Sequence, residues 1–121
     1  MHEVSQESIE LAEKHAICSI QQAKTTQKCG KVLQAMGGKE SEHGKLIEEY
    51  GKAAQQHAQA SLEHAKTAQK QDADSTEEFL QASAEHVKES QLKIMASKEC
   101  GKVIEERIKK NKKFLQQDGS I

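Results

Sequence analysis

The sequence predicts an all-α fold, an antiparallel bundle of three long helices with alanine-rich, coiled-coil-like packing. Its 121 residues include no proline, two phenylalanines, one tyrosine and no tryptophan. Fourteen alanines join long runs of Glu, Lys and Gln, which are among the strongest intrinsic helix formers. Runs of β-branched and aromatic residues, which are typical of strands, do not occur. Apolar residues instead recur at seven-residue intervals, as in packed parallel or antiparallel helices.

Two turn signals divide the chain into three helices. The first is the pair Gly37-Gly38, because paired glycines adopt positive φ readily and disfavour a helix. The second is the polar segment 71–78, in which Asp74 or Ser75 is expected to cap the next helix. The predicted helices cover residues of about 4–36, 40–71 and 75–116, within a single domain of residues 1–121. Such short connections make consecutive helices antiparallel.

Each predicted helix carries a row of apolar or small residues for contact with its neighbours. In the third helix, a strict seven-residue row is completed by a second, mostly serine row. We expect these rows to form a heptad seam: Leu80, Val87, Ile94, Gly101, Ile108 and Leu115, with Ser83, Ser90, Ser97 and Ile104. The contact residues expected in the first two helices are Ile9, Ala12, Ala16, Ile20, Ala23 and Leu33, then Ile47, Tyr50, Ala54, Ala58, Leu62, Ala65 and Ala68. Because alanine seams bury little apolar area, a lone unit would be marginally stable, and we expect it to dimerise.

An internal repeat is the most specific feature of the sequence. Residues 12–28 match residues 54–70 at nine of seventeen positions. The third helix joins the repeat at an offset of 71, with Cys100-Gly101-Lys102-Val103 matching Cys29-Gly30-Lys31-Val32. Each helix then contains a His-x-x-x-Ser unit, whose two side chains share one helix face: His15/Ser19, His57/Ser61 and His86/Ser90. The repeat indicates duplication of a helical unit. The alternative is a polar layer in which the three histidines meet.

Composition argues against several classes of function. No stretch is apolar and long enough to span a membrane, and the first residues lack the pattern of a secretory signal. Three cysteines at no zinc spacing suggest reduced thiols in the cytoplasm. The formal net charge of −1 offers no basic field for nucleic acid. Without a phosphate loop, an activated nucleophile or an enclosed pocket, we expect a protein that is not an enzyme and has no catalytic residue or cofactor.

Six histidines raise the alternative of a metal- or ligand-holding bundle. Di-iron bundles use paired Glu-x-x-His motifs, and only Glu40-x-x-His43 fits that spacing. His43, His57 and His64 share a stripe, but seven residues of helix span about 10.5 Å, too far for two of them to bind one zinc ion. A site that joins His15, His57 and His86 from three helices therefore stays open only as an alternative, and we assign no metal ligand.

The end of the third helix is the strongest candidate for a partner surface. Residues 107–113 hold five basic side chains and no acid, beside an apolar face that runs beyond the expected cover of the shorter helices. Apolar surface with a polar rim is typical of an interface, although a solvated helix end would also favour basic residues. The residues expected to bind a partner are Tyr50, His57, Ile104, Arg107, Ile108, Lys109, Lys112 and Phe114.

The length, the three long helices, the absence of proline and the Lys/Gln/Glu-rich composition resemble a small helical effector of intracellular bacterial pathogens. The resemblance is to the inhibitor of MavC-type ubiquitin deamidases, among type IV secreted effectors. It implies a chain that occludes the catalytic site of a ubiquitin deamidase or transglutaminase and that is translocated into a host cell. We expect a non-catalytic protein-binding regulator, and a secretion-chaperone-like structural protein is a further alternative.

Overall fold

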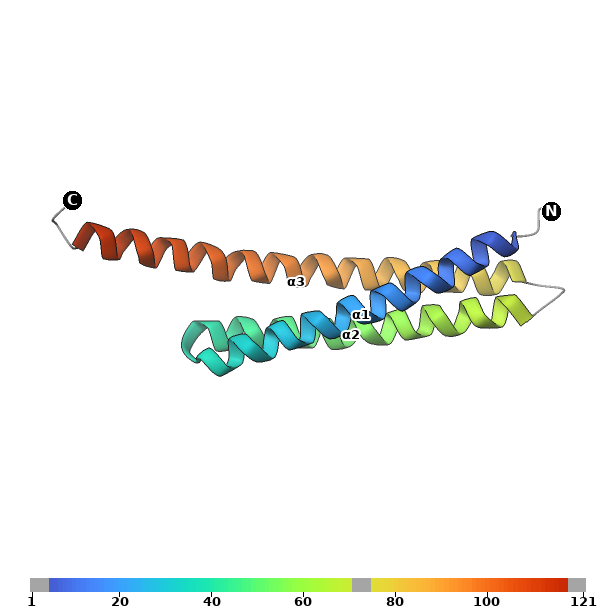
Figure 1. Ribbon diagram of the computed structural model, residues 1–121, viewed down its shortest axis with the longest axis horizontal. Coiled ribbons are helices and arrows are strands. Elements are labelled where there is room, and N and C mark those ends of the chain that lie inside the picture. The colour runs from blue at the N-terminus through green and yellow to red at the C-terminus, as the bar shows by residue number, and fades with distance from the viewer. Residues whose placement is uncertain (1–4, 71–74, 118–121) are drawn as a thin grey trace.

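The computed structural model consists of three long helices and confirms the predicted all-α, antiparallel three-helix bundle (Figure 1). It describes residues 5–70 and 75–117, with side chains up to Lys112. The helices are α1 (Gln6–Met36), α2 (Gly38–Lys70) and α3 (Ser75–Gln117). The side chains of Phe114 and Leu115, and the expected cap Asp74, lie outside the described part of the chain.

The helix ends follow from local chemistry. The Ser5 hydroxyl caps α1 by accepting the backbone N–H of Ser8 at 3.2 Å. At the other end, Gly37 and Gly38 have φ of 75° and 62°, values that cost little only for glycine. The Gly37 N–H donates to the Gln34 carbonyl at 3.3 Å. This turn is so tight that α2 begins at Gly38, two residues before its expected start.

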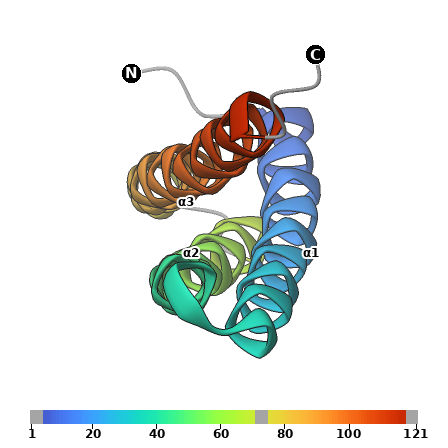
Figure 2. The same ribbon diagram turned by 90° about the vertical axis from the view of Figure 1, so that its left-hand side faces the viewer.

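The central helix, α2, packs against both α1 and α3, whereas α1 and α3 touch much less extensively. α1 runs obliquely, so the backbone of its C-terminal end lies beside α2 (Figures 1 and 2) and reaches α3 through side chains such as Met36. α3 continues past the α1–α2 turn as a projecting rod (Figure 1). The bundle is therefore open on the side where α1 and α3 face each other.

Small residues bring α1 and α2 into close contact. A Cβ built on Gly30 would lie 2.5 Å from the Gly44 carbonyl oxygen, and one on Gly44 would lie 2.5 Å from the Gly30 oxygen. Most of the contact residues predicted for these two helices are buried: Ile9, Ala16 and Ala23 on α1, and Ile47, Ala54, Ala58, Ala65 and Ala68 on α2. The other predicted contacts are half-buried: Ala12, Ile20, Leu33, Tyr50 and Leu62. Ser19 and Ser61, which were not predicted, are buried as well. Glycine and alanine let the two axes approach near the short end of the usual 8–10 Å range.

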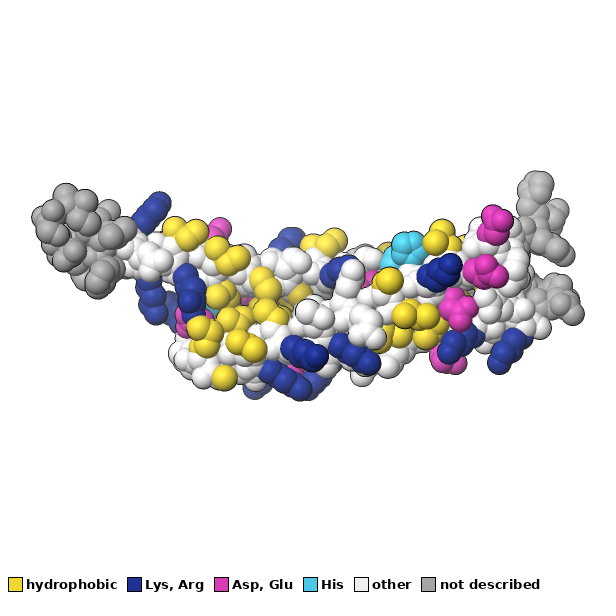
Figure 3. Space-filling view, in the orientation of Figure 1, with side chains coloured by type: hydrophobic (Ala, Val, Ile, Leu, Met, Phe, Trp, Pro, Cys, Tyr) yellow, Lys and Arg dark blue, Asp and Glu magenta, His cyan; other side chains and the backbone are white. Residues whose placement is uncertain are grey.

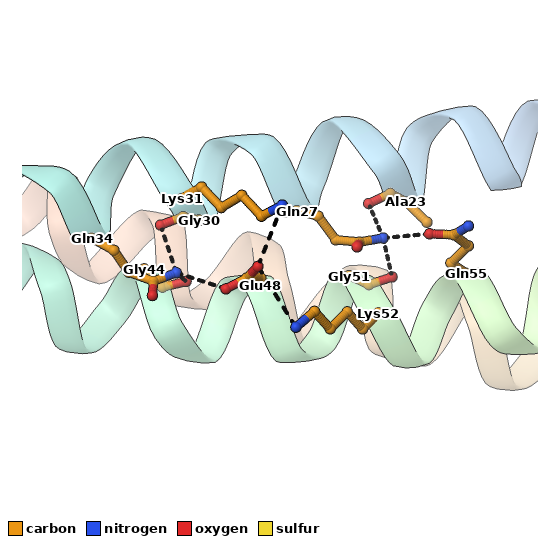
Figure 4. A network of polar contacts seen from close by, with 10 residues as sticks. All are labelled: Ala23, Gln27, Gly30, Lys31, Gln34, Gly44, Glu48, Gly51, Lys52 and Gln55. Atoms are coloured by element: carbon orange, nitrogen blue, oxygen red, sulfur yellow. Dashed lines mark hydrogen bonds and ion pairs between the residues drawn. The ribbon is translucent and has the colours of Figure 1, made fainter.

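Two glutamines close the edge of this contact (Figure 4). The Gln27 amide donates to the carbonyls of Ala23 and Gly51, each at 3.3 Å, and to Gln55 Oε1 at 2.6 Å. The Gln34 amide repeats the pattern one heptad later, with Glu48 Oε1 at 2.9 Å as its side-chain acceptor. Because both amides reach the backbone of each helix, they fix how far α1 can slide along α2.

The seam expected for α3 is wrong about which face packs inside the chain. The side chains of α3 that are buried against α2 are Ala82, Glu89, Ala96, Glu99 and Val103. The predicted row points outward instead: Leu80, Val87, Ile94, Ile104 and Ile108 are all roughly half exposed or more. Both rows have seven-residue spacing, and the row that pairs with α2 is the more polar of the two. The reason lies in the side chains of α2, described below.

Two repeat-equivalent glycines should respond oppositely to alanine. Gly30→Ala places a Cβ against backbone atoms of α2 at 2.5–2.6 Å, so we expect a loss of about 2 kcal/mol or more, as for overpacking. At Gly101 a Cβ meets nothing within 4 Å, so Gly101→Ala should add about 1 kcal/mol from helix propensity. Urea unfolding at nanomolar protein, where self-association contributes least, measures both. Equal effects of the two substitutions would contradict the close contact between α1 and α2.

Candidate functional site

The residues expected to bind a partner fall into two groups. Tyr50 and His57 lie on the face of α2 that is turned to α3, and both are half-buried. Ile104, Arg107, Ile108, Lys109 and Lys112 are exposed on the C-terminal part of α3. The structure therefore does not bring all of them onto one surface. We call the second group, with Lys110, the α3 tip.

A ladder of histidine–glutamate pairs joins α2 to α3. His64 Nδ1 lies 2.8 Å from Glu78 Oε2, and His57 Nδ1 lies 2.5 Å from Glu85 Oε2. At the far end, His43 Nδ1 lies 2.5 Å from Glu99 Oε2. Each step moves seven residues or a multiple of seven along both helices in opposite directions. The same pairing sets Tyr50, the fourth member of the α2 row, at the level of Leu92.

This ladder was missed by reasoning from the sequence, although its signal is present. From the sequence, the stripe of His43, His57 and His64 is considered for metal binding, and Tyr50 and His57 are assigned to partner binding. A matching stripe of glutamates at the same spacing occurs on the third helix: Glu78, Glu85, Glu99 and Glu106. Two polar stripes of complementary charge, on helices expected to be antiparallel, indicate a polar seam.

His43 has the most enclosed imidazole of the ladder and contacts two carboxylates. Its Nε2 lies 3.2 Å from Glu106 Oε1, in addition to the bond with Glu99. The hydrogen bond with Glu99 raises the pKa of His43, against the opposing effect of burial. The bond from His43 in turn lowers the pKa of Glu99, and the bond from His57 lowers the pKa of Glu85. The arrangement favours imidazolium–carboxylate pairs within a partly dry interface.

The open side between α1 and α3 forms a groove of about 420 Å³. His15 and His86 face each other across it, with ring centroids 6.0 Å apart. Its apolar walls include Leu11, Phe79 and Val87. Two of the three repeat histidines thus meet, while the third, His57, pairs with Glu85. Among the residues that the structure describes, no three His, Cys, Asp or Glu side chains are grouped so that they could hold a metal ion.

The three cysteines are free thiols. Cys18 and Cys29 are exposed on α1, and Cys100 is half-buried on α3. Burial and the neighbouring Cys29 raise the pKa of the Cys100 thiol. A raised pKa lowers the thiolate fraction at neutral pH, and the thiolate is the nucleophilic form.

The α3 tip is tied to the α1–α2 turn at one point. Arg107 Nε lies 3.6 Å from Glu40 Oε1, and its Nη2 donates to the Met36 sulfur at 3.5 Å. Around it, Gly38, Lys39, Glu40, Glu106, Lys109 and Lys110 line a shallow hollow of about 410 Å³. Hydrophobic side chains gather where the C-terminal half of α1 lies beside α3 (Figure 3). The tip thus combines fixed guanidinium geometry, free lysines and exposed isoleucines.

Comparison with protein-family models, curated proteins and solved structures finds no match. No described helix is both long and apolar enough to cross a membrane.

The ladder predicts a pH window of maximal stability. The raised pKa of His43 means that its contribution is complete below the ordinary value of 6.5 and is lost as pH rises through the folded-state pKa. The lowered pKa values of Glu85 and Glu99 mean that their contributions are present above 4.5 and are lost as pH falls through the folded-state pKa values. We therefore expect the highest Tm between about pH 4.5 and 6.5, with a fall of several degrees toward pH 8.5.

His43→Gln tests the origin of the alkaline part of that profile. The amide does not titrate, so thermal unfolding of this variant should depend less on pH between 6 and 9, at a lower overall Tm. His86→Gln is the matched control, because His86 is more exposed and lies 3.7 Å from Glu89. An unchanged alkaline limb in His43→Gln, or its loss in the control, would contradict the assignment.

Proposed function

We propose that this chain is a non-catalytic regulator that binds and inhibits a partner protein through the α3 tip. The single observation that supports the proposal best is the exposure of Ile104 and Ile108, at 59% and 49%, within a basic surface. Burial of such side chains at the centre of an interface contributes more than their scattered exposure on a surface. The open end of a projecting helix also gives a partner access from several sides.

Charge at the tip defines the chemistry of the partner. Lys109, Lys110 and Lys112 are exposed, and none of their described atoms is within ion-pair distance of a described carboxylate. Flexible lysines at the rim of an interface increase the rate of association with an acidic surface. Buried apolar side chains mainly set the rate of dissociation. Arg107, held by Glu40 and Met36, is preorganised to orient such a surface. The expected partner has an apolar patch with an acidic rim.

A finer proposal rests on the architectural resemblance alone. The partner would be a cysteine deamidase or transglutaminase that modifies ubiquitin, and the chain would occlude its catalytic site. The chain would act in the cytoplasm, including that of a host cell into which it is translocated. Size, three-helix architecture and the exposed tip support this reading, and no residue motif does.

Two experiments test the general and the finer proposal. One measures binding to a purified MavC-type ubiquitin deamidase, and the other captures binding proteins from the source cell. Ile108→Glu and Arg107→Glu should each weaken binding by roughly tenfold or more, the scale of an interface hot spot. Ile17→Glu is the control, because Ile17 is exposed on α1 to a similar degree, outside the α3 tip. Circular dichroism checks that each variant remains helical.

The outcomes separate the two proposals. If the deamidase does not bind, but another captured protein shows the same dependence on Ile108 and Arg107, the finer proposal is wrong and the coarser one stands. If the tip variants bind every captured protein as well as the Ile17→Glu control does, the α3 tip is not the binding surface.

A ligand-holding role is a second candidate, favoured by the approach of His15 and His86 in an apolar-walled groove. Titration with zinc and elemental analysis of the purified chain test it. Stoichiometric zinc that is lost in His15→Ala would support a metal-holding bundle. Less than stoichiometric metal in the purified chain would refute the metal-holding role.

A further inference from the structure

The internal repeat of the sequence is also a spatial arrangement. α1 and α3 run parallel, and residues 71 apart lie side by side. His15 faces His86, Gln22 accepts a hydrogen bond from Lys93, and Met36 accepts one from Arg107. Equivalent positions of the first and third repeats therefore occupy the same level of the bundle, and their surroundings can be compared directly.

One face is equivalent in all three helices, and we call it the repeat face. On α1 it consists of Ile9, Ala16, Ser19, Ala23 and Gly30, and on α2 of Gly51, Ala58, Ser61 and Ala65. These nine residues are all buried. The repeat faces of α1 and α2 pack against each other antiparallel, with Ala23 near Gly51 and Gly30 against Gly44. The face is thus used twice for the same kind of contact.

Although Val87 borders the groove beside α1, no helix of the described chain covers the third copy of the repeat face. Its members are Leu80, Val87, Ser90, Ile94 and Gly101, and the row continues to Ile108. Leu80 is 61% exposed, and Val87 and Ile94 are each 55% exposed. Val87 and Ile94 are larger and more apolar than Ala16 and Ala23, which are buried at the equivalent positions of α1, and Leu80 is equivalent to the buried Ile9. An exposed apolar row of this length is typical of an interface.

Gly101 gives an independent indication of a missing neighbour. Its equivalent, Gly30, is required by the backbone of α2, which leaves no room for a Cβ. At Gly101 a Cβ would meet nothing within 4 Å. Glycine inside a helix costs about 1 kcal/mol relative to alanine, and no contact within the described chain offsets that cost. A helix from outside the chain that packs closely against Gly101 would offset that cost.

We infer that the occupant is a second copy of this chain, whose α3 packs antiparallel on the repeat face of α3. The direction follows from the pairing of α1 with α2, where the same face meets its own equivalent in antiparallel orientation. A two-fold axis at Ile94 sets Ile94 opposite itself, Val87 opposite Gly101, and Leu80 opposite Ile108. Val87 thereby faces the small Gly101, while Ile94 and Leu80 each face a large aliphatic side chain.

The neighbouring positions fit this pairing. On the flank of the repeat face, antiparallel packing sets Lys98 opposite Gln91 and Glu105 opposite Ala84, so like charges do not meet there. On the other flank, the incoming helix lies over the groove between α1 and α3, next to Leu11, which is 56% exposed. The result is an isologous dimer, in which the added helix completes the up-and-down alternation of a four-helix arrangement.

Light scattering after size exclusion tests the dimer with the full chain. The natural chain should elute at twice its chain mass at micromolar concentration. Gly101→Gln fills the space opposite Val87, at a position where a Cβ meets no intrachain atom within 4 Å, and should raise the dissociation constant roughly tenfold or more. Met95→Gln is the matched control, because Met95 is exposed beside the repeat face and not on it. A monomeric natural chain, or equal effects of the two variants, would overturn the inference.

Disulfide cross-linking tests the antiparallel orientation, in a background in which Cys18, Cys29 and Cys100 are replaced by serine. On oxidation, Ile94→Cys should form a covalent dimer alone. Leu80→Cys should form one only when mixed with Ile108→Cys. Cross-linking of Leu80→Cys with itself would indicate parallel pairing and overturn the proposed orientation.

The dimer contact and the proposed partner surface share Ile108, so they are separated at residues that only one of them uses. Gly101 and Ile94 lie outside the α3 tip, so Gly101→Gln weakens self-association and leaves Arg107 and the lysines in place. Partner capture that is unchanged in Arg107→Glu, with an intact dimer, would refute only the tip proposal, and a monomeric natural chain that still captures a partner through Arg107 would refute only the dimer.

Discussion

The close approach of α1 and α2 is the constraint on which the rest of the structure depends. Gly30 and Gly44 allow backbone contact between the two helices, and alanines maintain the short separation along both rows. This contact uses the small-residue face of α2. The neighbouring face of α2 carries His43, Tyr50, His57 and His64, so α3 packs beside it through polar side chains. The buried Ser61 hydroxyl also donates directly to the Ala82 carbonyl of α3 at 2.8 Å.

Histidine–glutamate pairs are a suitable solution for that second contact. Each pair satisfies polar atoms of both partners, so that Glu99 is buried without an unsatisfied oxygen. Buried ion pairs contribute less to net stability than apolar contacts of similar size. These pairs instead fix the register of α3 along α2, because a shift of α3 by one heptad would set His57 against Leu92 in place of Glu85. The ladder thereby fixes which face of α3 remains outside.

The helices, their directions and the seam between α1 and α2 could be predicted from sequence, because local propensity and small-residue spacing determine them. The α3 seam could not. Apolar periodicity favours the row through Val87 and Ile94 over the row through Glu85 and Glu99. It takes no account of the side chains that α2 presents to α3. Only the pairing of His57 with Glu85 and His43 with Glu99 reverses that preference. For the same reason Tyr50 and His57 were grouped with the tip residues, although the ladder holds their row between the helices.

Side-chain size on the repeat face carries information that burial alone does not. Ala16 and Ala23 of α1 correspond to Val87 and Ile94 of α3, and Ile9 corresponds to Leu80. If the outer face of α3 were only solvated, polar residues would serve there at lower cost, since exposed aliphatic side chains give no burial energy. Larger side chains at these positions instead fit a neighbour whose axis lies farther away than α2 lies from α1. Gly101, within this bulky row, would then leave the space into which Val87 of the second copy packs.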